Sequence, residues 1–450
     1  MQDRTRKIVW SAIAVGAIAV GACTGGGPFS DAELATLRTY ALTAIPADES
    51  NMYADRADVA RLGKKLYFET RFSGPLSAHN APGVPGSLGA AGDVQKVACA
   101  SCHDPAQAGA DRRSLPSATS LGAGYTTRNA PAVFNAAYSP LWQFWDGHAD
   151  SLWSQALSPP EGEAECNSSR LEVAHVVADY YRAEYDAVFG TGAMPDLSDT
   201  SRFPDAGKPG QQLFDDMRPE DKQTINEIYV RFGKAIAAYE RRLVSTAFEP
   251  SPFDRFMAGD ERAMSPAAIR GARLFVGHAG CNECHRGATF TDFSFHNVGA
   301  PQTGSYVPAV DLGRYAGIDV LVHSPFNRDS SYSDKPQAQH IAALTPLDPT
   351  APFHATDGQF KTPTLRNVAR TAPYMHDGAY ATLWDVVDHY NFGGSSGQYA
   401  GTKDPAIAPL MLSDAELGDV VEFLRALDDG PALPTDDFPE GLIAPPALPP

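Results

Sequence analysis

The chain has 450 residues, which is long enough for two domains that each bury a core of their own. Apolar residues make up 43% and charged residues 20%, as in a globular protein, and 39 glycines and 36 prolines indicate long irregular loops. The formal net charge of −18 argues against nucleic acid as a partner, because no surplus of basic side chains is available to displace phosphate counterions.

The first 22 residues have the pattern of a secretory signal. A basic start precedes an apolar run from Ile8 to Ala22, which is too short and too rich in glycine and alanine for a comfortable membrane span. The stretch Val20-Gly-Ala-Cys23 resembles a bacterial lipobox, so we predict a periplasmic protein whose only membrane contact is a lipid on Cys23, with 23–50 as a linker. Cleavage as an ordinary signal peptide, with Cys23 incidental, is the alternative.

Two Cys-x-x-Cys-His motifs are present, Cys99-Ala-Ser-Cys102-His103 and Cys281-Asn-Glu-Cys284-His285. In such a motif each Cys sulfur adds to a haem vinyl group, and the following His reaches the iron as proximal ligand. With six Cys and twelve His in the chain, one chance match is expected roughly 0.002 times. We therefore predict two covalently bound haem c groups, which fits export, since cytochrome c maturation takes place outside the cytoplasm.

Two other readings of the cysteines are weaker. A zinc site would need both Cys pairs to meet around one ion and would not need a His directly after each pair. A thiol redox motif of the thioredoxin kind needs a βαβ context, which the sequence lacks. The remaining cysteine of the mature region, Cys166, is interpreted as an idle thiol.

A weak repeat precedes the two motifs and predicts the domain organisation. Residues Ala60 to Phe68 and Ile269 to Val276 both resemble the N-terminal helix of a class I cytochrome c, whose small and apolar residues pack on a C-terminal helix. A loop rich in glycine, proline, alanine and serine, 72–98, separates the first copy from its motif. We predict a first haem domain over 51–260 and a second over 261–430.

Further helices are indicated by periodicity and by capping residues. An apolar stripe at 3.6-residue spacing runs from Ile225 to Leu243. Ser265-Pro266 is a good start for the helix that opens the second domain, and the capping box Ser413-Asp-Ala-Glu416 starts its closing helix. No run alternates like a strand, so the expected fold is mainly α, with long irregular loops and a proline-rich tail at 431–450 that is loose or wraps over the surface.

Three further stretches, Phe144 to Glu165, Thr362 to Gly378 and Val386 to Gly394, resemble the bacterial dihaem cytochrome c peroxidase family, in particular its MauG/MbnH-like branch. The resemblance extends from about residue 50 to 430. It implies two class I cytochrome c-like domains packed around two c-type haems, and an oxidoreductase that acts on hydrogen peroxide.

The resemblance also implies roles for residues around the first haem. Peroxide would bind at the haem held by His103, and Trp145 would lie between the two haems. Gln155, Pro159 and Glu165 match the distal pocket, in which Glu165 would move a proton between the peroxide oxygens. From the residues alone, Trp145 could be a core tryptophan. Glu165 could be a solvated carboxylate, since the neighbouring Glu161 and Glu163 allow a shifted alignment.

Two more sites follow from the resemblance. Tyr390 matches the distal ligand of the second haem, with Met375 as the rival ligand and a core tyrosine as the structural alternative. Asn129 and the carbonyl groups of Thr371 and Pro373 match a calcium site between the domains, and all three offer the hard oxygen donors that calcium prefers.

Two departures from the family pattern bear on function. No His or Met lies between Asp104 and Gly147, so we expect the first haem to be open at rest, without reductive activation. Ala279 stands where MauG has a surface Trp, which puts radical transfer to a protein substrate by that route in doubt. His148 replaces a usual Arg, with no assigned effect.

The resulting hypothesis is an exported dihaem c-type peroxidase that takes electrons from a periplasmic donor, such as a small cytochrome or a cupredoxin. One alternative is a MauG/MbnH-like enzyme that uses peroxide to oxidise residues of a partner protein. Another is a dihaem cytochrome that only transfers electrons. Such a carrier would cap both irons with strong ligands, and the sequence offers none for the first.

Overall fold

The computed structural model describes residues 27–337, 341, 344 and 354–449. Over these ranges, helices alternate with long irregular segments, and the named strands are one antiparallel pair, β1 (Phe295–His296) with β2 (Phe360–Lys361). The mainly helical fold predicted from the sequence is therefore confirmed. None of the helices in this part of the chain is both long and apolar enough to cross a membrane.

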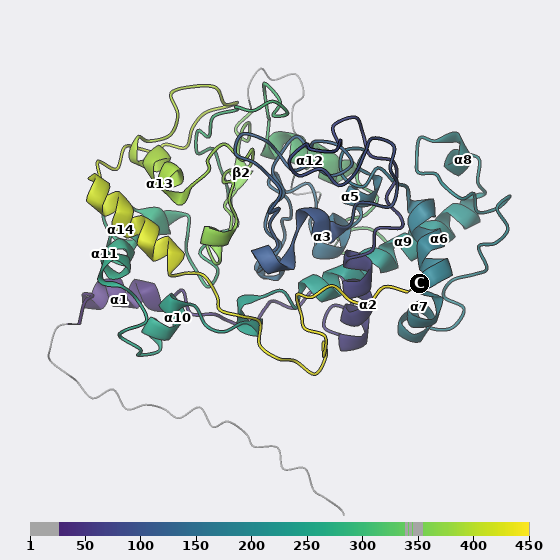
Figure 1. The fold of residues 1–450 in the computed structure, drawn as a ribbon, viewed down its shortest axis with the longest axis horizontal. Helices are drawn as coiled ribbons and strands as arrows, with labels where there is room; N and C mark the ends of the chain where they lie inside the picture. Colours follow the sequence, from purple (N-terminus) through teal and green to yellow (C-terminus); the bar gives the residue numbers. More distant parts are fainter. Residues whose placement is uncertain (1–26, 338–340, 342–343, 345–353, 450) are drawn as a thin grey trace, which may run out of the picture.

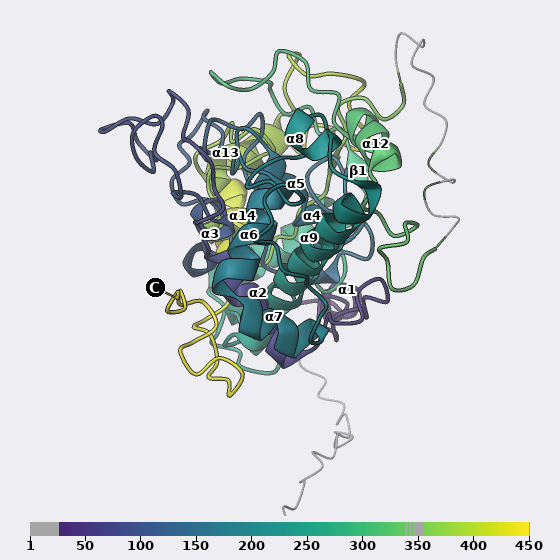
Figure 2. The same cartoon turned by 90° about the vertical axis from the view of Figure 1, so that its right-hand side faces the viewer.

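One hydrophobic cluster forms around two crossing helices, α2 (Ala57–Tyr67) and α9 (Pro219–Glu240), seen on the right of Figure 1 and side by side in Figure 2. The crossing depends on Gly63, where a Cβ atom would lie 1.8 Å from the carbonyl oxygen of Ala235. Only a residue without a side chain allows the two backbones to approach so closely.

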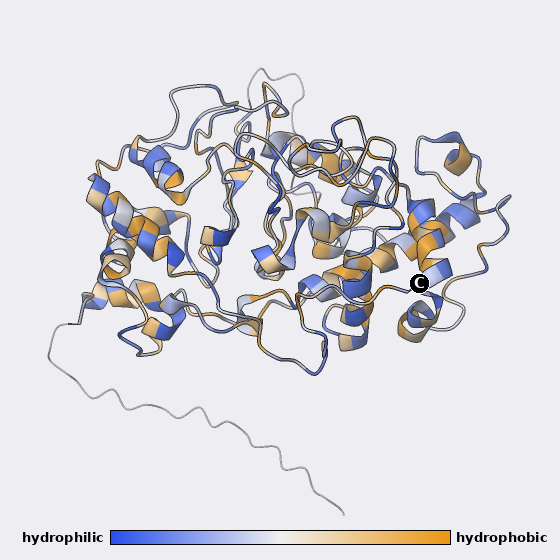
Figure 3. Ribbon diagram, viewed as in Figure 1, coloured by the Kyte–Doolittle hydropathy of each residue, from blue (hydrophilic) through white to orange (hydrophobic). Residues whose placement is uncertain are grey.

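The second cluster repeats this arrangement with α11 (Pro266–Val276) and α14 (Asp414–Arg425). A Cβ atom on Gly271 would lie 1.9 Å from the carbonyl oxygen of Asp419. The predicted caps are confirmed: the Ser265 side chain accepts a hydrogen bond from the Ala268 backbone N–H, and Ser413 with Glu416 forms a capping box. Figure 3 shows apolar and polar residues sharing these helices, as expected where one face is buried.

The other elements are short and connect these helix pairs. The α-helices are α1 (Asp31–Arg38), α3 (Cys99–Cys102), α4 (Leu152–Gln155), α5 (Ser158–Glu161), α6 (Arg170–Tyr180), α7 (Arg182–Phe189), α8 (Gln212–Asp215), α10 (Pro252–Met257), α12 (Arg314–His323) and α13 (Leu383–Asn391). The 3-10 turns are η1 (Pro105–Gln107), η2 (Ala136–Tyr138), η3 (Ser245–Ala247), η4 (Cys281–Glu283) and η6 (Val368–Arg370).

Both ends of the described chain pack against the clusters. In the segment interpreted as a linker, Leu37 at the end of α1 and Tyr40 are buried in the second cluster. The proline-rich tail crosses from α14 to the other cluster in Figure 1, where Phe438 and Leu442 are buried. Lys64 of α2 forms an ion pair with Glu440 at 3.0 Å, so the tail is held on the surface of the first cluster.

Candidate functional site

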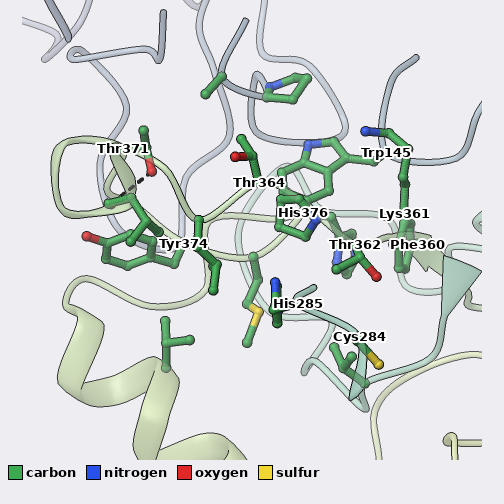
Figure 4. A pocket seen from close by; sticks show the side chains of 18 of the residues that line it. Trp145, Cys284, His285, Phe360, Lys361, Thr362, Thr364, Thr371, Tyr374 and His376 are labelled. Carbon is green, nitrogen blue, oxygen red and sulfur yellow. Dashed lines mark hydrogen bonds between the residues drawn. The ribbon is translucent and has the colours of Figure 1, made fainter. Parts of the chain in front are cut away.

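A single cavity connects the surroundings of both motif histidines. His103 from the first cluster and His285 from the second both line it, together with Trp145. In Figure 4, Trp145 lies on one side of the pocket and His285 with Cys284 on the other. Two groups bound at the two histidines would therefore face the same interior space.

The two imidazoles are held in the same way. The Nδ1 atom of His103 lies 2.9 Å from the carbonyl oxygen of Pro131, and that of His285 lies 2.9 Å from the carbonyl oxygen of Phe290. A carbonyl fixes the proton on Nδ1 and leaves Nε2 free to bind iron. Burial lowers the pKa of both imidazoles, which favours the neutral form that ligates a metal. The residues present thus fit a haem at each motif.

A tyrosine supports each histidine from the backbone side. The Tyr67 hydroxyl donates to the carbonyl oxygen of His103 at 2.5 Å, and the Tyr40 hydroxyl donates to that of His285 at 3.1 Å. Tyr67 ends α2, whereas Tyr40 comes from the segment before α2 and stacks on Phe290 at 4.2 Å. Sequence reasoning missed both residues, because neither is close to its histidine in the chain.

The four motif cysteines are half-buried. Burial raises the pKa of Cys102 and Cys281 to about 12. Among the described residues, the one His/Cys/Asp/Glu group close enough to hold a metal is Cys284, Asp292 and His296, so the two Cys pairs do not meet around one ion. Cys166 is buried, which supports its interpretation as an idle thiol.

The haem attachment can be tested by removing one Cys pair at a time. After expression with a cytochrome c maturation system, we expect two covalent haems per chain, detected by haem staining on a denaturing gel and by mass spectrometry. Cys99→Ser/Cys102→Ser and Cys281→Ser/Cys284→Ser should each retain one haem, because each pair forms its own thioethers. A wild-type stoichiometry of one would contradict the assignment.

Trp145 lines the same cavity as His103 and His285. Its indole N–H donates to the carbonyl oxygen of Asn129 at 2.8 Å, and its own carbonyl accepts from the Lys361 backbone N–H at 2.7 Å. The ring is half-buried and lines the cavity rather than a closed core. This placement fits a residue between two haems better than a core tryptophan.

The three glutamates of the acidic run have different surroundings. Glu161 pairs with Arg170 at 2.8 Å, and Glu163 is exposed. Glu165 is half-buried, and its carboxylate lies against Gly162 of the same loop. Burial raises its pKa, and the charge of His148 opposes the rise only in part. Its charge also contributes to the raised pKa values of Cys99 and Cys102, which places it beside the first motif.

The other two residues assigned to the distal pocket flank a tight turn. Gln155 ends α4 and lines the cavity. Pro159 lies in α5, and its carbonyl oxygen accepts hydrogen bonds from the backbone N–H groups of Gly162 and Cys166. These bonds fold the 162–166 loop back on α5.

Both candidate ligands of the second haem line the cavity. Tyr390 comes from α13, and its phenol interacts electrostatically with Cys281 and Cys284. Met375 comes from the loop before α13 and has a left-handed backbone, with φ of 69°. Because both side chains reach the same cavity, the choice between them rests on their chemistry.

The residues of the expected calcium site lie together in part. The Asn129 side-chain amide donates to the carbonyl oxygen of Pro373 at 3.0 Å, and Thr371 lines the same cavity. Asn129 is buried, and its carboxamide oxygen accepts from the Ser120 hydroxyl at 3.3 Å. Asn129 thus contacts Pro373 through its amide nitrogen, whereas its carboxamide oxygen contacts Ser120.

Sequence analysis did not identify two titratable residues that line the cavity, Glu240 and Lys361. Glu240 at the end of α9 has one carboxylate oxygen without a hydrogen-bond partner among the described residues, and burial raises its pKa to about 8. Burial lowers the pKa of Lys361 to about 8. Glu240 could have been found from sequence, since it lies four residues after Ile236, on the apolar stripe of its helix.

Comparison with known proteins gives consistent matches. A family model described as di-haem cytochrome c peroxidase matches residues 57–262. Cytochrome-c peroxidase IdrP1 of Denitromonas iodatirespirans is 31% identical, covering 95% of this chain and 96% of its own. Methylamine utilization protein MauG of Methylorubrum extorquens is 30% identical, covering 94% of this chain and 95% of its own.

Solved structures with the same fold are found as well. A MauG-like protein associated with microbial copper homeostasis is 25% identical, with a TM-score of 0.56 over 90% of this chain and 97% of its own. The diheme peroxidase BthA from Burkholderia thailandensis is 22% identical, with a TM-score of 0.58 over 87% of this chain and 90% of its own. The second likeness is one of fold alone.

Proposed function

Since this chain belongs to the di-haem cytochrome c peroxidase and MauG family, we propose that it reduces hydrogen peroxide with two haem c groups and electrons from a periplasmic donor protein. The proposal includes a class I cytochrome c-like domain around each motif, over 51–260 and 261–430, and a calcium ion at Asn129, Thr371 and Pro373. The observation that carries it is the cavity that His103 and His285 share, each with its Nδ1 atom held by a backbone carbonyl group.

Proton movement at the first haem is the work of Glu165. When bound, the haem held by His103 supplies the redox chemistry of O–O cleavage. The Glu165 carboxylate takes the proton from the peroxide oxygen nearer the iron and delivers it to the oxygen that leaves as water. Its raised pKa supports the first step, because a stronger base accepts the proton more readily, and it keeps the carboxyl group protonated until the proton passes to the leaving oxygen. Gln155 and Pro159 shape the space around it.

Trp145 would conduct electrons between a haem held by His285 and a haem held by His103. Its ring lines the cavity that both histidines share, and its indole N–H is fixed by the carbonyl group of Asn129. A periplasmic donor protein would supply the single electrons that complete each turnover. The donor is a small cytochrome or a cupredoxin, which fits the excess of acidic residues in the chain, since complementary charge steers partners together.

The test is anaerobic spectroscopy of the diferric holoprotein. One equivalent of peroxide, added without prior reduction, should change the absorption of both haems at once, and a reduced donor should restore the starting spectrum. A dihaem electron carrier with both irons capped would show no such reaction. Absence of any spectral response to peroxide would remove the peroxidase proposal.

A second function, oxidation of a partner protein as a MauG-like enzyme, is favoured by the position of Tyr390. This phenol lines the cavity beside the second Cys pair and offers an oxygen donor that stabilises oxidised iron. Against it, Ala279 provides no oxidisable ring next to the second motif. The two functions share the peroxide reaction and differ in what reduces the enzyme afterwards.

Location is tested at Cys23, which lies outside the described residues. We expect acylation and membrane fractionation of the wild type, because a lipid on the mature N-terminus is the anchor that the lipobox-like sequence predicts. Cys23→Ser should give a soluble or unprocessed form. Mass spectrometry showing an unmodified N-terminus at another residue would contradict the anchor.

A further inference from the structure

A stacked pair of tyrosines lies at the protein surface near the first haem site. The rings of Tyr125 and Tyr306 are 3.7 Å apart between centroids and 10° from parallel. The imidazole of His79 meets both edge-on, with centroids 5.5 Å from Tyr125 and 5.2 Å from Tyr306. Tyr306 has 36% of its surface exposed, and His79 is exposed as well, so solvent reaches the group from outside.

The pair is tied to the loop that carries Glu165. The backbone N–H of Ala123 donates to the carbonyl oxygen of Glu165 at 2.7 Å, and that of Gly124 donates to Ala164 at 2.9 Å. On its other side, the carbonyl oxygen of Ala123 accepts from the Ser77 N–H at 2.7 Å, two residues before His79. Backbone hydrogen bonds therefore connect the segment before His79, through Ala123, to Glu165.

The spacing within this connection is tight. A Cβ atom on Gly124 would lie 3.6 Å from both the Cα of Ala164 and the Nδ1 of His79. The imidazole and the Glu165 loop therefore both lie close to Gly124. Tyr125 follows Gly124 directly in the chain.

The chemistry of the group suits one-electron oxidation. A phenol is among the most easily oxidised side chains, and a parallel neighbour at contact distance shares the charge deficit of an oxidised ring. Oxidation of a phenol also releases its proton, for which His79 is a base beside both rings. If the stack served only to pack the loop, neither His79 nor Tyr306 would need to be exposed to solvent.

We propose that Tyr125 and Tyr306 form a surface oxidation site, at which one-electron donors too large for the haem cavity, such as the redox centre of a partner protein, reduce the enzyme. This rests on the proposed peroxidase function, which supplies the oxidant. One tyrosine gives an electron inward and its phenolic proton to His79, and the external donor then returns one electron while the proton returns from His79. Two rounds supply the two electrons that convert one peroxide, with two protons from solvent, into two waters.

The alanine at position 279 is a reason to expect a route for electrons away from the second motif. Alanine cannot be oxidised, and Ala279 is itself buried, so this position beside the second motif offers no ring. The tyrosine pair is on the side of the first haem instead, directly outside the loop of the proton-transfer group. A large donor could thus be oxidised without passing its electrons through the second haem.

The test uses the diferric holoprotein, the double variant Tyr125→Phe/Tyr306→Phe, and the matched control Tyr180→Phe, which removes an exposed tyrosine packed on Arg71. One equivalent of peroxide is added without donor, and freeze-quenched samples are read by electron paramagnetic resonance with ring-deuterated tyrosine. We expect a tyrosyl radical in the wild type and in Tyr180→Phe, and its loss in the double variant. Oxidation of reduced cytochrome c, the large probe, should be lost with it, whereas oxidation of ascorbate, the small probe, should persist.

The outcomes separate the two proposals. A wild type that consumes peroxide but gives the same radical and the same cytochrome c oxidation in the double variant overturns the surface site and leaves the peroxidase intact. A wild type that consumes peroxide and forms no tyrosyl radical also overturns the site. A holoprotein that does not react with peroxide removes both, since no oxidant would then reach the pair.

Discussion

Replacing Glu165 by Gln should lower peroxide turnover by roughly 10²–10⁴-fold while both haems stay attached. Glutamine keeps the volume of the side chain but can neither accept the first peroxide proton nor deliver it to the leaving oxygen. Turnover is measured with the holoprotein and a reduced donor, and haem content by absorption. An effect of this size requires the carboxylate to contact the reacting oxygens, which is the role proposed for Glu165.

The neighbouring glutamates provide matched controls for this change. Glu163→Gln removes an exposed carboxylate and should leave turnover close to that of the wild type. Glu161→Gln breaks the ion pair with the buried Arg170, so it should lower the free energy of unfolding more than it lowers turnover. If Glu163→Gln instead abolished turnover, the proton-transfer role would belong to Glu163 rather than to Glu165.

The pH dependence of turnover gives an independent check on Glu165. Burial raises the pKa of its carboxyl group, and the reaction begins with the deprotonated form acting as a base. Activity should therefore fall as the pH is lowered through this raised pKa, at a pH above that expected for an ordinary glutamate of about 4.3. Glu163→Gln should show the same loss of activity at low pH. A loss of activity only near the ordinary pKa of glutamate would show that the Glu165 carboxylate is solvated.

The parts of the fold that sequence predicts well depend on local or repeated signals. The caps at Ser265 and Ser413 satisfy backbone groups within three residues, so their sequence pattern is sufficient. Gly63 and Gly271 occupy equivalent places in the weak repeat, and each allows a helix crossing. A repeat shows which residues correspond, even where it does not show what they contact.

What sequence cannot predict are contacts made over long separations in the chain. Tyr40 belongs to a segment with no readable motif, yet its hydroxyl reaches the carbonyl oxygen of His285, 245 residues away. Glu240 and Lys361 face the shared cavity from different parts of the chain, and only the assembled fold brings them there. The hydrogen bonds from Ala123 and Gly124 to the Glu165 loop are likewise visible only in three dimensions.

The identity of the distal ligand of the second haem would distinguish the two candidate functions. Tyr390 lies one turn after Val386 and Val387, and all three residues line the cavity. Burial raises the pKa of the Tyr390 phenol, so without a nearby cation it stays protonated. Ferric iron opposite His285 would supply that positive charge and favour the phenolate.

The expected result for Tyr390→Phe is a large rise in the reduction potential of the second haem. A phenolate is an anionic oxygen donor that stabilises oxidised iron, and its removal takes this stabilisation away. The variant should keep both haems, because attachment depends on the Cys pairs. Its peroxide-oxidised state should no longer spread over both haems, which is measured by spectroelectrochemical titration and by absorption after one equivalent of peroxide.

Met375→Leu is the decisive counterpart, since the Met375 side chain lines the same cavity. A thioether favours reduced iron and raises the potential, as suits a haem that receives single electrons from a small donor. If Tyr390 is the ligand, Met375→Leu should leave the potential of the second haem nearly unchanged. A thioether–iron charge-transfer band in the ferric protein, lost in Met375→Leu and kept in Tyr390→Phe, would instead assign Met375. The enzyme would then be suited to donor-driven peroxide reduction, and the case for oxidation of a partner protein would lose its main support.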